Sequence, residues 1–405
     1  MLAPDPTRLA HDQLARDRED TTRFPGIYER KLARMSISPH AYLRGTAPLF
    51  YGLLKRHSAL ERGPAGTGWL CGDAHVENFG VYRTASARAD KAGKRAPVVF
   101  DVNDFDETIV GPWRYDVLRL LTSLILGGRE MGADGLGSIE RSRLLLESYV
   151  DAAFREQHLP EVPPSVAKLI AKVKRRSHVD LLNRRTRLVK GGRVFVRGDR
   201  YTQLPKRLEP LAIRAFERYA KTIRVRPGLA RPFEVVDVAF RIAGTGSLGK
   251  LRVAVLTCGK GGRDGAWIFD MKEQGVPAPT VLLRAPASEP AERVISGIEG
   301  SVRRAPRMIG KTKLDGLSMF VRRLAPQEDK LDLARVAPAE LGAIAAYLGS
   351  VLGRAHRRAA TRMPARPWTT AEQNALLDRA VIMAGIHEAA YLAMCKAQTD
   401  PALAR

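Results

Sequence analysis

Apolar residues recur every three or four positions through much of the chain, a spacing that is typical of amphipathic helices. The pattern is clearest in the stretches 118–125, 144–153 and 166–173. Residues 1–60 and the chain from Pro338 onward have the same helical character. The sequence therefore predicts helices near both ends and through much of the middle of the chain.

A different pattern begins near Phe233, where apolar and polar residues alternate as in β-strands. Glycine-rich turns separate three alternating runs, at 235–240, 251–256 and 267–272. Because short turns join consecutive runs, they predict an antiparallel meander. A helix at 289–304 and a strand at 318–322 are expected to follow.

Shorter strand-like runs lie at 68–71 and 97–101. A loop rich in Lys, Arg and Ala joins them at 84–95, and a basic turn at 190–201 predicts a small hairpin. Helical and antiparallel β regions in one chain predict an α+β protein.

The charge of the chain favours anionic partners. Its 405 residues include 67 Lys and Arg against 43 Asp and Glu, a formal charge of +24. Such a field attracts nucleotides, phosphorylated metabolites, nucleic acid or acidic surfaces. The charge alone is compatible with nucleic-acid binding, but no helix-turn-helix, zinc-finger or RNA-binding aromatic motif accompanies it. We therefore attribute most of the charge to a solvated basic surface.

Cysteine usage and the apolar runs bear on location. The three cysteines are far apart, so neither a disulfide framework nor a zinc site is expected. The first 20 residues are polar and of mixed charge, unlike a signal peptide. The longest apolar run, 117–126, contains Arg119 and is too short to cross a bilayer. We therefore expect no membrane span and a cytoplasmic protein.

Two short acidic blocks stand out against this basic background. The first contains Asp73, His75 and Asn78, and the second contains Asp104 and Asp106. Carboxylate and amide oxygens are preferred ligands of Mg²⁺, the usual companion of phosphate chemistry. Closely spaced carboxylates repel, and a divalent cation stabilises such clusters. The alternative is a set of Asx-rich turns with a structural role only.

A glycine-rich loop lies between the first two alternating runs. Gly244, Gly246 and Gly249 give the pattern G-x-G-x-x-G, with Ser247 between them. A dinucleotide-binding fingerprint requires a helix after this loop, whereas here a strand-like run follows. A kinase-type loop lies between antiparallel strands, where its backbone N–H groups approach nucleotide phosphates. We therefore expect these four residues to bind nucleotide.

Lys272 ends the next alternating run, in the position of the third-strand lysine that holds the α- and β-phosphates in kinases. A lone strand-end lysine is more often solvated, but the preceding glycine loop favours the nucleotide-binding role. Kinases pair this lysine with a helix glutamate. Glu299 and Glu292 both lie on the next helix, and we prefer Glu299 because it is nearer the helix centre.

The first acidic block has the spacing of a kinase catalytic loop. Asp73 precedes Asn78 by five positions, as the catalytic Asp precedes the metal-binding Asn in kinases. In those roles Asp73 orients the acceptor hydroxyl and accepts its proton, and Asn78 binds Mg²⁺. His75 is a candidate to contact phosphate or acceptor, with a structural role as the alternative.

The second block supplies the other metal ligand. Asp104 stands where kinases carry the metal-binding Asp of Asp-Phe-Gly, and Asp101 and Asp106 compete for that role. We expect Asn78, Asp104 and Asp106 to form the metal site. Lys272 and Asp104, although far apart in sequence, should then face one cleft.

These motifs resemble those of aminoglycoside and choline kinase-like phosphotransferases. Residues 72–78 are similar to their His-Gly-Asp-x-His-x-x-Asn loop, and residues 104–116 to their metal-binding segment with its downstream structural Asp. Most of the chain also resembles a bacterial family catalogued as domain of unknown function 2252. That resemblance is carried by the segments 34–45, 72–80 and 101–116.

Two features depart from the kinase pattern. Cys71 stands where the related kinases carry a His before Gly-Asp. In addition, kinases place the glycine loop and lysine before the catalytic loop, whereas here they come after it. A circular permutation would reconcile the two orders, with the hinge near 321–326 and the helix 344–359 preceding the catalytic loop. His356 in that helix is expected to be structural.

The resemblance implies an α+β, two-lobed protein-kinase-like fold, circularly permuted, with a helical lobe and a smaller antiparallel β-rich lobe. The expected parts are an N-terminal helical segment, a helical catalytic lobe, a β-rich nucleotide-binding lobe and C-terminal helices packing on the catalytic lobe. Their boundaries are 1–60, 61–232, 233–327 and 328–405, in that order.

The implied function is a phosphotransferase that uses ATP and Mg²⁺ and acts on a hydroxyl of a small molecule or protein. The first alternative is a nucleotidyl transferase of the same fold, with the nucleotide flipped. The others are a metal-dependent phosphohydrolase and a non-catalytic nucleotide or nucleic-acid binding protein. A hydrolase usually needs more histidine ligands than the eight scattered histidines here provide.

Overall fold

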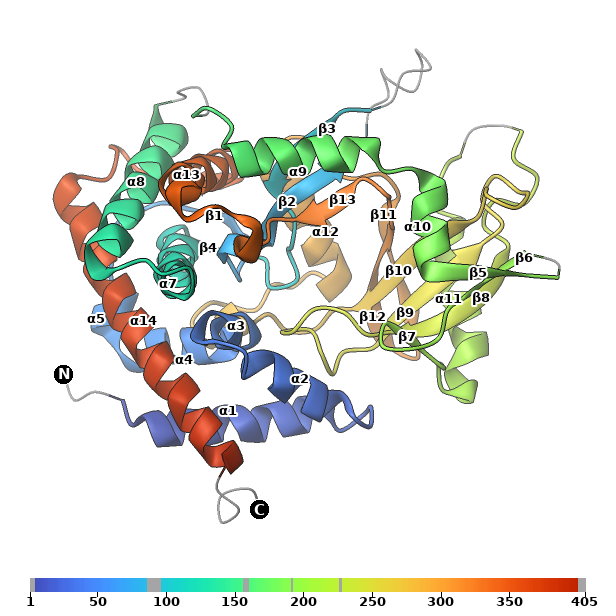
Figure 1. The fold of residues 1–405 in the computed structure, drawn as a ribbon, viewed down its shortest axis with the longest axis horizontal. Coiled ribbons are helices and arrows are strands. Elements are labelled where there is room, and N and C mark those ends of the chain that lie inside the picture. Colours follow the sequence, from blue (N-terminus) through green and yellow to red (C-terminus); the bar gives the residue numbers. More distant parts are fainter. Residues whose placement is uncertain (1–3, 86–95, 156–159, 191, 226–227, 400–405) are drawn as a thin grey trace.

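The helical and strand-like segments of the sequence form separate halves of an α+β structure (Figure 1). The computed structural model describes residues 4–85, 96–155, 160–190, 192–225 and 228–399. The basic loop expected at 84–95 therefore lies almost entirely outside the described residues.

The helical half is built from both ends of the chain and its middle. Its helices are α1 (Pro6–Thr21), α2 (Ile27–Met35), α3 (Pro39–Gly45), α4 (Ala47–Arg56), α5 (Ser58–Glu61), α7 (Arg114–Glu130), α8 (Gly135–Phe154), α9 (Pro164–Arg175), α13 (Leu341–Arg358) and α14 (Thr370–Thr399). Local sequence sets where several begin: Ser38 caps α3 by accepting a hydrogen bond from Ala41 N, and Pro39 occupies the first turn. The periodic stretches of the sequence are thus confirmed as helices.

Small residues let two of these helices pack closely. A Cβ on Gly349 of α13 would lie 2.2 Å from the carbonyl oxygen of Leu145 in α8. One turn on, a Cβ on Gly353 would lie 2.5 Å from the carbonyl oxygen of Tyr149. The backbones of α8 and α13 therefore approach more closely than any side chain larger than glycine would allow at these points.

The β-rich half is an antiparallel sheet with the strand order β11-β12-β10-β9-β8-β7. Its strands are β7 (Tyr201–Thr202), β8 (Val235–Arg241), β9 (Arg252–Thr257), β10 (Trp267–Glu273), β11 (Ile309–Leu314) and β12 (Leu317–Arg323). The meander of β8, β9 and β10 and the strand β12 are as expected, as is the helix between them, α12 (Pro290–Ser301). The strand β11 was not expected.

Strand alternation divides the residues of β10 between two environments. Phe269 and Met271 are buried in a core with Phe216 and Tyr219 of α11 (Glu209–Ala220). Asp270 and Lys272 therefore lie on the other face of the sheet, where they line a cavity.

Smaller sheets connect the two halves. One has the order β14-β1-β4, from β14 (Ala360–Arg362), β1 (Thr67–Leu70) and β4 (Ile109–Pro112). Another has the order β13-β2-β3, from β13 (Glu328–Lys330), β2 (Phe79–Arg83) and β3 (Val98–Val102). A two-stranded hairpin of β5 (Thr186–Val189) and β6 (Gly192–Phe195) forms slightly earlier than the basic turn predicted.

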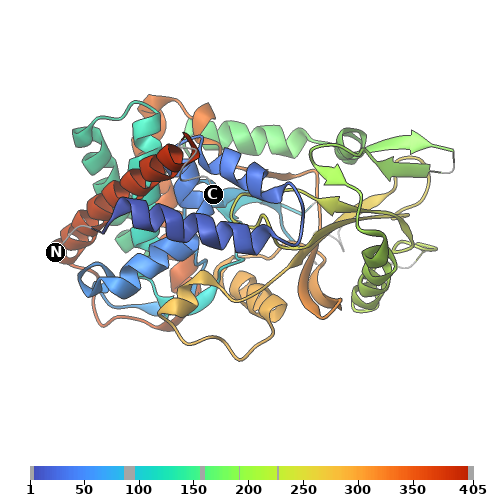
Figure 2. The same ribbon diagram turned by 90° about the horizontal axis from the view of Figure 1, so that it is seen from below.

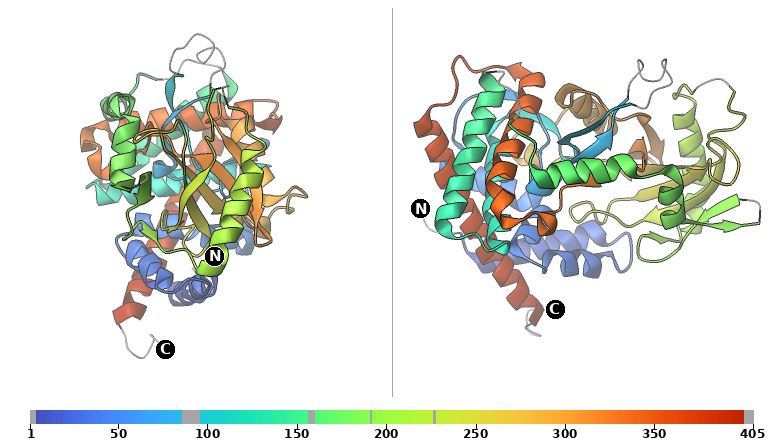
Figure 3. Two further views of the ribbon diagram at one scale, coloured as in Figure 1. Left: turned by 90° about the vertical axis from the view of Figure 1, so that its right-hand side faces the viewer. Right: turned by 45° about the horizontal axis from the view of Figure 1, so that its top comes forward.

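The β-rich half begins earlier in the chain than the boundary at 233. Helix α10 (His178–Arg185) contributes Leu181 and Leu182 to a core with strands β8, β9 and β10, and α11 covers the sheet. Helix α9 runs from the helical half toward the sheet (Figure 3). Seen from below, α1 crosses the helical half in the same direction (Figure 2).

Helix α14 is long and apolar enough by length and composition to cross a membrane, and no other helix among the described residues is. Leu376, Leu377, Met383 and Met394 of α14 are buried in the main hydrophobic core. Contact with other helices, among them α1 and α7, therefore accounts for part of its apolar composition, whereas Val381, Ile382 and Leu392 are exposed.

Candidate functional site

Two adjoining cavities lie between the six-stranded sheet and the helical half. We call the smaller, of about 500 Å³, the arginine chamber, because Arg241, Arg252 and Arg322 line it. The larger, of about 1060 Å³, is the wide chamber, which Asp73 and Asn78 line. Residues that line both chambers are Asp104, Asp106, Gly244, Ser247, Lys272 and Lys330. Lys272 and Asp104 thus face one cleft, together with all the predicted residues except Glu299.

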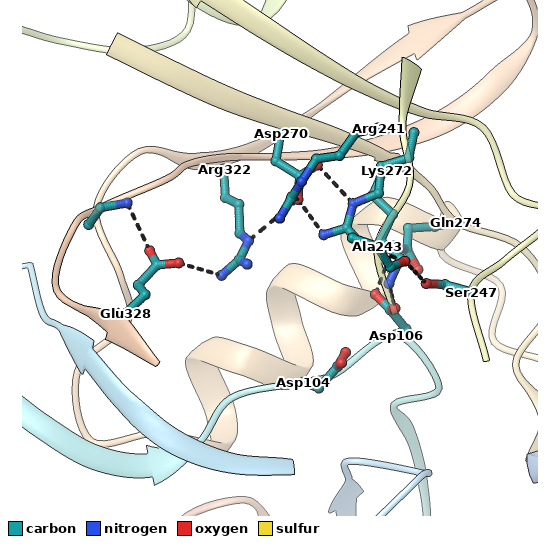
Figure 4. A network of polar contacts seen from close by, with 12 residues as sticks. Asp104, Asp106, Arg241, Ala243, Ser247, Asp270, Lys272, Gln274, Arg322 and Glu328 are labelled. Carbon is teal, nitrogen blue, oxygen red and sulfur yellow. Dashed lines mark hydrogen bonds and ion pairs between the residues drawn. The ribbon is translucent and has the colours of Figure 1, made fainter. Parts of the chain in front are cut away.

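Lys272 meets an acidic residue from the other half of the chain. Its ammonium contacts Oδ2 of Asp106, 166 positions away, and Gln274 Nε2 donates to Oδ1 of the same carboxylate at 3.0 Å (Figure 4). Burial lowers the pKa of Lys272 to about 8, with Lys330 and Arg322 acting in the same direction and Asp104 opposing them. The lysine is therefore a buried cation beside two carboxylates.

The structure does not bring Glu299 to Lys272, so the predicted lysine–glutamate pair is corrected to Lys272–Asp106. Glu299 is exposed, because its neighbours Gly297 and Ile298 occupy the buried face of α12. Glu292, the alternative, pairs instead with Lys311 at 2.9 Å. Arg293 of α12 does reach Asp106, since its guanidinium donates to the carbonyl oxygen of Asp106 at 2.9 Å.

Asp73 is held by a buried arginine. Nε of Arg119 donates to Oδ1 of Asp73 at 2.5 Å, and Nη2 donates to the carbonyl oxygen of Leu43 at 2.9 Å. Burial raises the pKa of Asp73 to about 6, and Glu107 and Asp104 add to this while Arg119 opposes it. A carboxyl group with such a pKa is suited to accept a proton near neutral pH.

Asn78 lines the wide chamber, and a hydrogen bond to the backbone of Asp73 orients its amide. Its Nδ2 donates to the carbonyl oxygen of Asp73 at 2.6 Å. Its Oδ1 is buried and has no hydrogen-bond partner among the described residues. A buried amide oxygen without a donor suits a cation ligand.

Asp104 completes this oxygen-rich side of the cleft. Lys330 Nζ donates to its Oδ2 at 3.3 Å. Burial alone would raise the pKa of Asp104, but the nearby ammonium groups of Lys330 and Lys272 outweigh it and hold the pKa below its usual range. Asp104 is therefore ionised, as a metal ligand must be.

The predicted metal ligands fit a divalent cation in part. Asn78 Oδ1 and the Asp104 carboxylate offer oxygens, whereas both oxygens of Asp106 are engaged by Lys272 and Gln274. Within the described part of the chain, no group of three or more His, Cys, Asp or Glu side chains is arranged to hold a metal ion. A cation here would therefore also need oxygen atoms from a bound substrate or from water, which is usual for Mg²⁺.

His75 lines the wide chamber, but its side chain is not positively charged and so is poorly suited to bind phosphate. It is 5% exposed, and its Nδ1 is buried without a hydrogen-bond partner among the described residues. Burial, reinforced by Arg44 and Lys330, holds its pKa well below the usual range. The imidazole is therefore neutral at physiological pH.

Asp116 fixes the loop that carries Asp73. This buried carboxylate accepts hydrogen bonds from Cys71 N at 2.7 Å and Gly72 N at 3.0 Å. His356 Nε2 lies 3.2 Å from the same group, and its other ring nitrogen contacts Tyr149 OH at 2.8 Å. Asp116 thus supports this loop through backbone groups, which do not depend on the side chain at position 71, and His356 is structural.

The glycine loop joins β8 to β9 and lies against the N-terminal helices. Gly244 and Gly249 have φ of +79° and +103°, values that favour glycine. A Cβ on Gly249 would lie 2.4 Å from the carbonyl oxygen of Asp20 in α1. A guanidinium nitrogen of Arg34 donates to the carbonyl oxygen of Gly244. The loop is therefore anchored at both ends, with Ser247 facing both chambers.

The sequence patterns missed the arginines of the arginine chamber and Lys330, and also Asp270, Arg119 and Gln274. Arg119 and Gln274 contact the cleft residues Asp73 and Asp106 from behind the cavity lining. Arg119 had a signal, since it is the only charged residue in the apolar run 117–126. Asp270 had a weaker one, a carboxylate inside a strand two positions before Lys272. Gln274 had none, because its role depends on the position of Asp106.

A comparison of the sequence with known families identifies a match over most of the chain. The model of a family described as "Uncharacterized protein conserved in bacteria (DUF2252)" matches residues 23–397. The chain belongs to this DUF2252 family. The match includes both acidic blocks, the glycine loop and Lys272, whereas the residues of α1 that line the wide chamber, between Asp12 and Asp20, lie outside it. No curated protein and no solved structure matches the chain.

Proposed function

We propose that this DUF2252 protein is a phosphotransferase that uses ATP and Mg²⁺ and modifies a hydroxyl of a small molecule or protein. The observation that carries the proposal is the contact of Lys272 with Asp106 beside Asp104. A buried lysine next to ionised carboxylates and an unpaired amide oxygen is the combination that nucleotide phosphates and their cation require. The glycine loop borders the same cleft.

Each side chain has a chemical role in this proposal. Asp73, with its pKa near 6, accepts the proton of the acceptor hydroxyl as the oxygen attacks phosphorus. Asn78 and Asp104 are the residues that would hold Mg²⁺, which neutralises charge on the phosphate oxygens. Lys272 binds the phosphates, and the loop at Gly244–Gly249 contacts them through its backbone.

The order of elements supports a circularly permuted kinase-like fold. The glycine loop between β8 and β9, the lysine on β10 and the helix α12 follow one another as in the nucleotide lobe of a kinase. The end of α13 lies against β1, where Trp69 N donates to the carbonyl oxygen of Ala359 at 3.1 Å. Strand β1 leads directly into the Asp73 loop, so joining α13 to it would restore the kinase order.

Calorimetric titration of the full chain with ATP, with and without Mg²⁺, tests the proposal. The expected result is binding that requires Mg²⁺ and weakens about tenfold or more in Lys272→Ala and Asp104→Asn, since each loses charged contacts. Asp73→Asn should retain binding but lose ATP turnover. Lys311→Ala is the control, because Lys311 lies on the same sheet and is 43% exposed. Equal binding by all these proteins would overturn the proposal.

A further inference from the structure

The arginine chamber has an unusual charge distribution at its centre. Asp270 is 2% exposed and accepts hydrogen bonds from Arg252 through Nε at 2.9 Å and Nη2 at 2.5 Å. A guanidinium nitrogen of Arg241 also contacts this carboxylate, and Arg322 Nε lies 3.9 Å from it. Asp270, Arg241 and Arg322 point into the cleft (Figure 4). Arg252 lies on β9, between the strands of Arg241 and Asp270.

Positive charge exceeds negative charge around Asp270. Three guanidinium groups share this carboxylate, and among the described residues only Arg322 pairs with a second carboxylate, that of Glu328 at 3.3 Å. Arg252 also donates from Nη1 to the carbonyl oxygen of Ala243 at 3.4 Å. Nε of Arg241 is buried without a hydrogen-bond partner among the described residues. Burial lowers the pKa of Arg241 to about 10, which reflects a buried cation with too little countercharge. The cluster therefore carries more positive than negative charge, which suits an anionic ligand.

The sheet side of the chamber, around Asp270, is unsuited to a nucleotide base, although Val294, Ile298 and Phe320 give other parts of the lining an apolar character. In kinases the third strand reads Val-Ala-Ile-Lys, so a small apolar residue stands two positions before the lysine. Here Asp270 occupies that position, with its arginines around it. A flat, largely apolar base would leave these buried guanidinium groups unpaired, whereas phosphate oxygens match their geometry.

We propose that the arginine chamber binds the terminal phosphates of the nucleoside triphosphate, so that the protein transfers the nucleotidyl group. This inference rests on the proposed function, because it assumes a nucleotide in the cleft. Asp270 and Lys272 are two residues apart on one strand, about 7 Å. Terminal phosphates bound at the arginines therefore leave the α-phosphate near Lys272 and Asp104, and the nucleoside extends into the wide chamber.

The transfer step balances without an additional reactant. The acceptor hydroxyl oxygen forms a bond to the α-phosphorus, and its proton passes to the carboxylate of Asp73. The bond from the α-phosphorus to the oxygen that bridges to the β-phosphorus breaks, and pyrophosphate leaves with that electron pair. No atom is oxidised or reduced.

Competition binding is the first test, with Mg²⁺ present and inorganic tripolyphosphate as the probe. Tripolyphosphate should compete with ATP, adenosine should not, and Arg322→Gln should weaken tripolyphosphate and ATP about tenfold. Arg241→Gln serves as a second variant if Arg322→Gln does not fold. Arg207→Gln is the matched control, since Arg207 is 74% exposed on the same half and lines neither chamber.

Product analysis is the second test, using ATP labelled at the α- or γ-phosphorus with water or the chain itself as acceptor. Pyrophosphate as the product, with the α-label on the acceptor, supports the inference. ADP as the product, with ATP affinity that depends on Lys272 but not on Arg322 or Arg241, overturns it and leaves the proposed function standing. Failure to bind ATP at all, with tripolyphosphate still bound, overturns both.

Discussion

Arg119, fully buried in helix α7, donates from Nε to Oδ1 of Asp73 at 2.5 Å. Its guanidinium also lies 4.9 Å from the centre of the Phe50 ring, so it cannot move without leaving a buried cavity. One cation therefore both orients the Asp73 carboxylate and limits the rise in its pKa. Arg119 is a positioning residue for the proposed general base.

The pH dependence of ATP turnover should report this pair. In the proposed mechanism Asp73 accepts a proton only when it is ionised, so turnover should fall as the pH drops through about 6. Arg119→Met removes the opposing positive charge, so the pKa of Asp73 should rise further and the acid limb should move up by about 1 unit or more. Arg129→Met, an exposed position on the same helix, is the control.

The same pKa can be measured without turnover. The infrared band of the Asp73 carboxyl group can be assigned because it is lost in Asp73→Asn. The pKa of Asp73 measured from this band should be about 6 in the wild type and higher in Arg119→Met. An unchanged titration in Arg119→Met would contradict the role given to this arginine.

Asp116 should contribute strongly to stability. Replacing it by Ala leaves the buried N–H groups of Cys71 and Gly72 without acceptors. Loss of two hydrogen bonds to a charged group predicts a fall of about 3 kcal/mol or more in the free energy of unfolding, measured by urea denaturation. Asp332→Ala, at a half-exposed pair with Arg335, should change it by less than about 0.5 kcal/mol. Similar losses of stability in both variants would contradict the supporting role given to Asp116.

A larger residue at Gly249 of the glycine loop should lower stability for two reasons: the positive φ of this position and the close approach of the Asp20 carbonyl oxygen. Gly316, in the turn between β11 and β12, also has a positive φ but has nothing within 4 Å of an added Cβ. Gly316→Ala should therefore cost only about 1 kcal/mol of backbone strain. Gly249→Ala should cost more, because its Cβ meets the carbonyl oxygen of Asp20, and it alone should weaken ATP binding. Thermal unfolding and calorimetry measure the two effects.

Two helix glycines should respond in opposite directions to the same substitution. Gly349→Ala places a methyl group against the carbonyl oxygen of Leu145, which predicts a loss of about 1–3 kcal/mol. Gly385 of α14 is exposed with nothing within 4 Å of an added Cβ. Gly385→Ala should therefore stabilise the protein by up to about 1 kcal/mol through helix propensity. Loss of stability in both variants would show that the α8–α13 contact is not the cause.

Local sequence patterns predicted correctly the strands and the loop that form much of the cleft. The alternating runs form β8, β9 and β10, and the glycine loop lies between the first two as expected. Strand alternation also places Asp270 and Lys272 on one face, which the sequence already implies. The short strands β2 and β4 were missed, because four or five residues flanked by acidic turns carry little periodic signal.

By itself the sequence determined the α+β class, most elements, and the residue types available for phosphate and metal binding, because these follow from periodicity and spacing over a few residues. Only the tertiary structure decided which side chains meet. The partner of Lys272 is Asp106 and not Glu299, and Arg241, Arg252 and Arg322 converge on Asp270. These contacts join segments tens to more than a hundred residues apart, so they depend on strand register, helix rotation and the packing of the two halves, which no local pattern encodes.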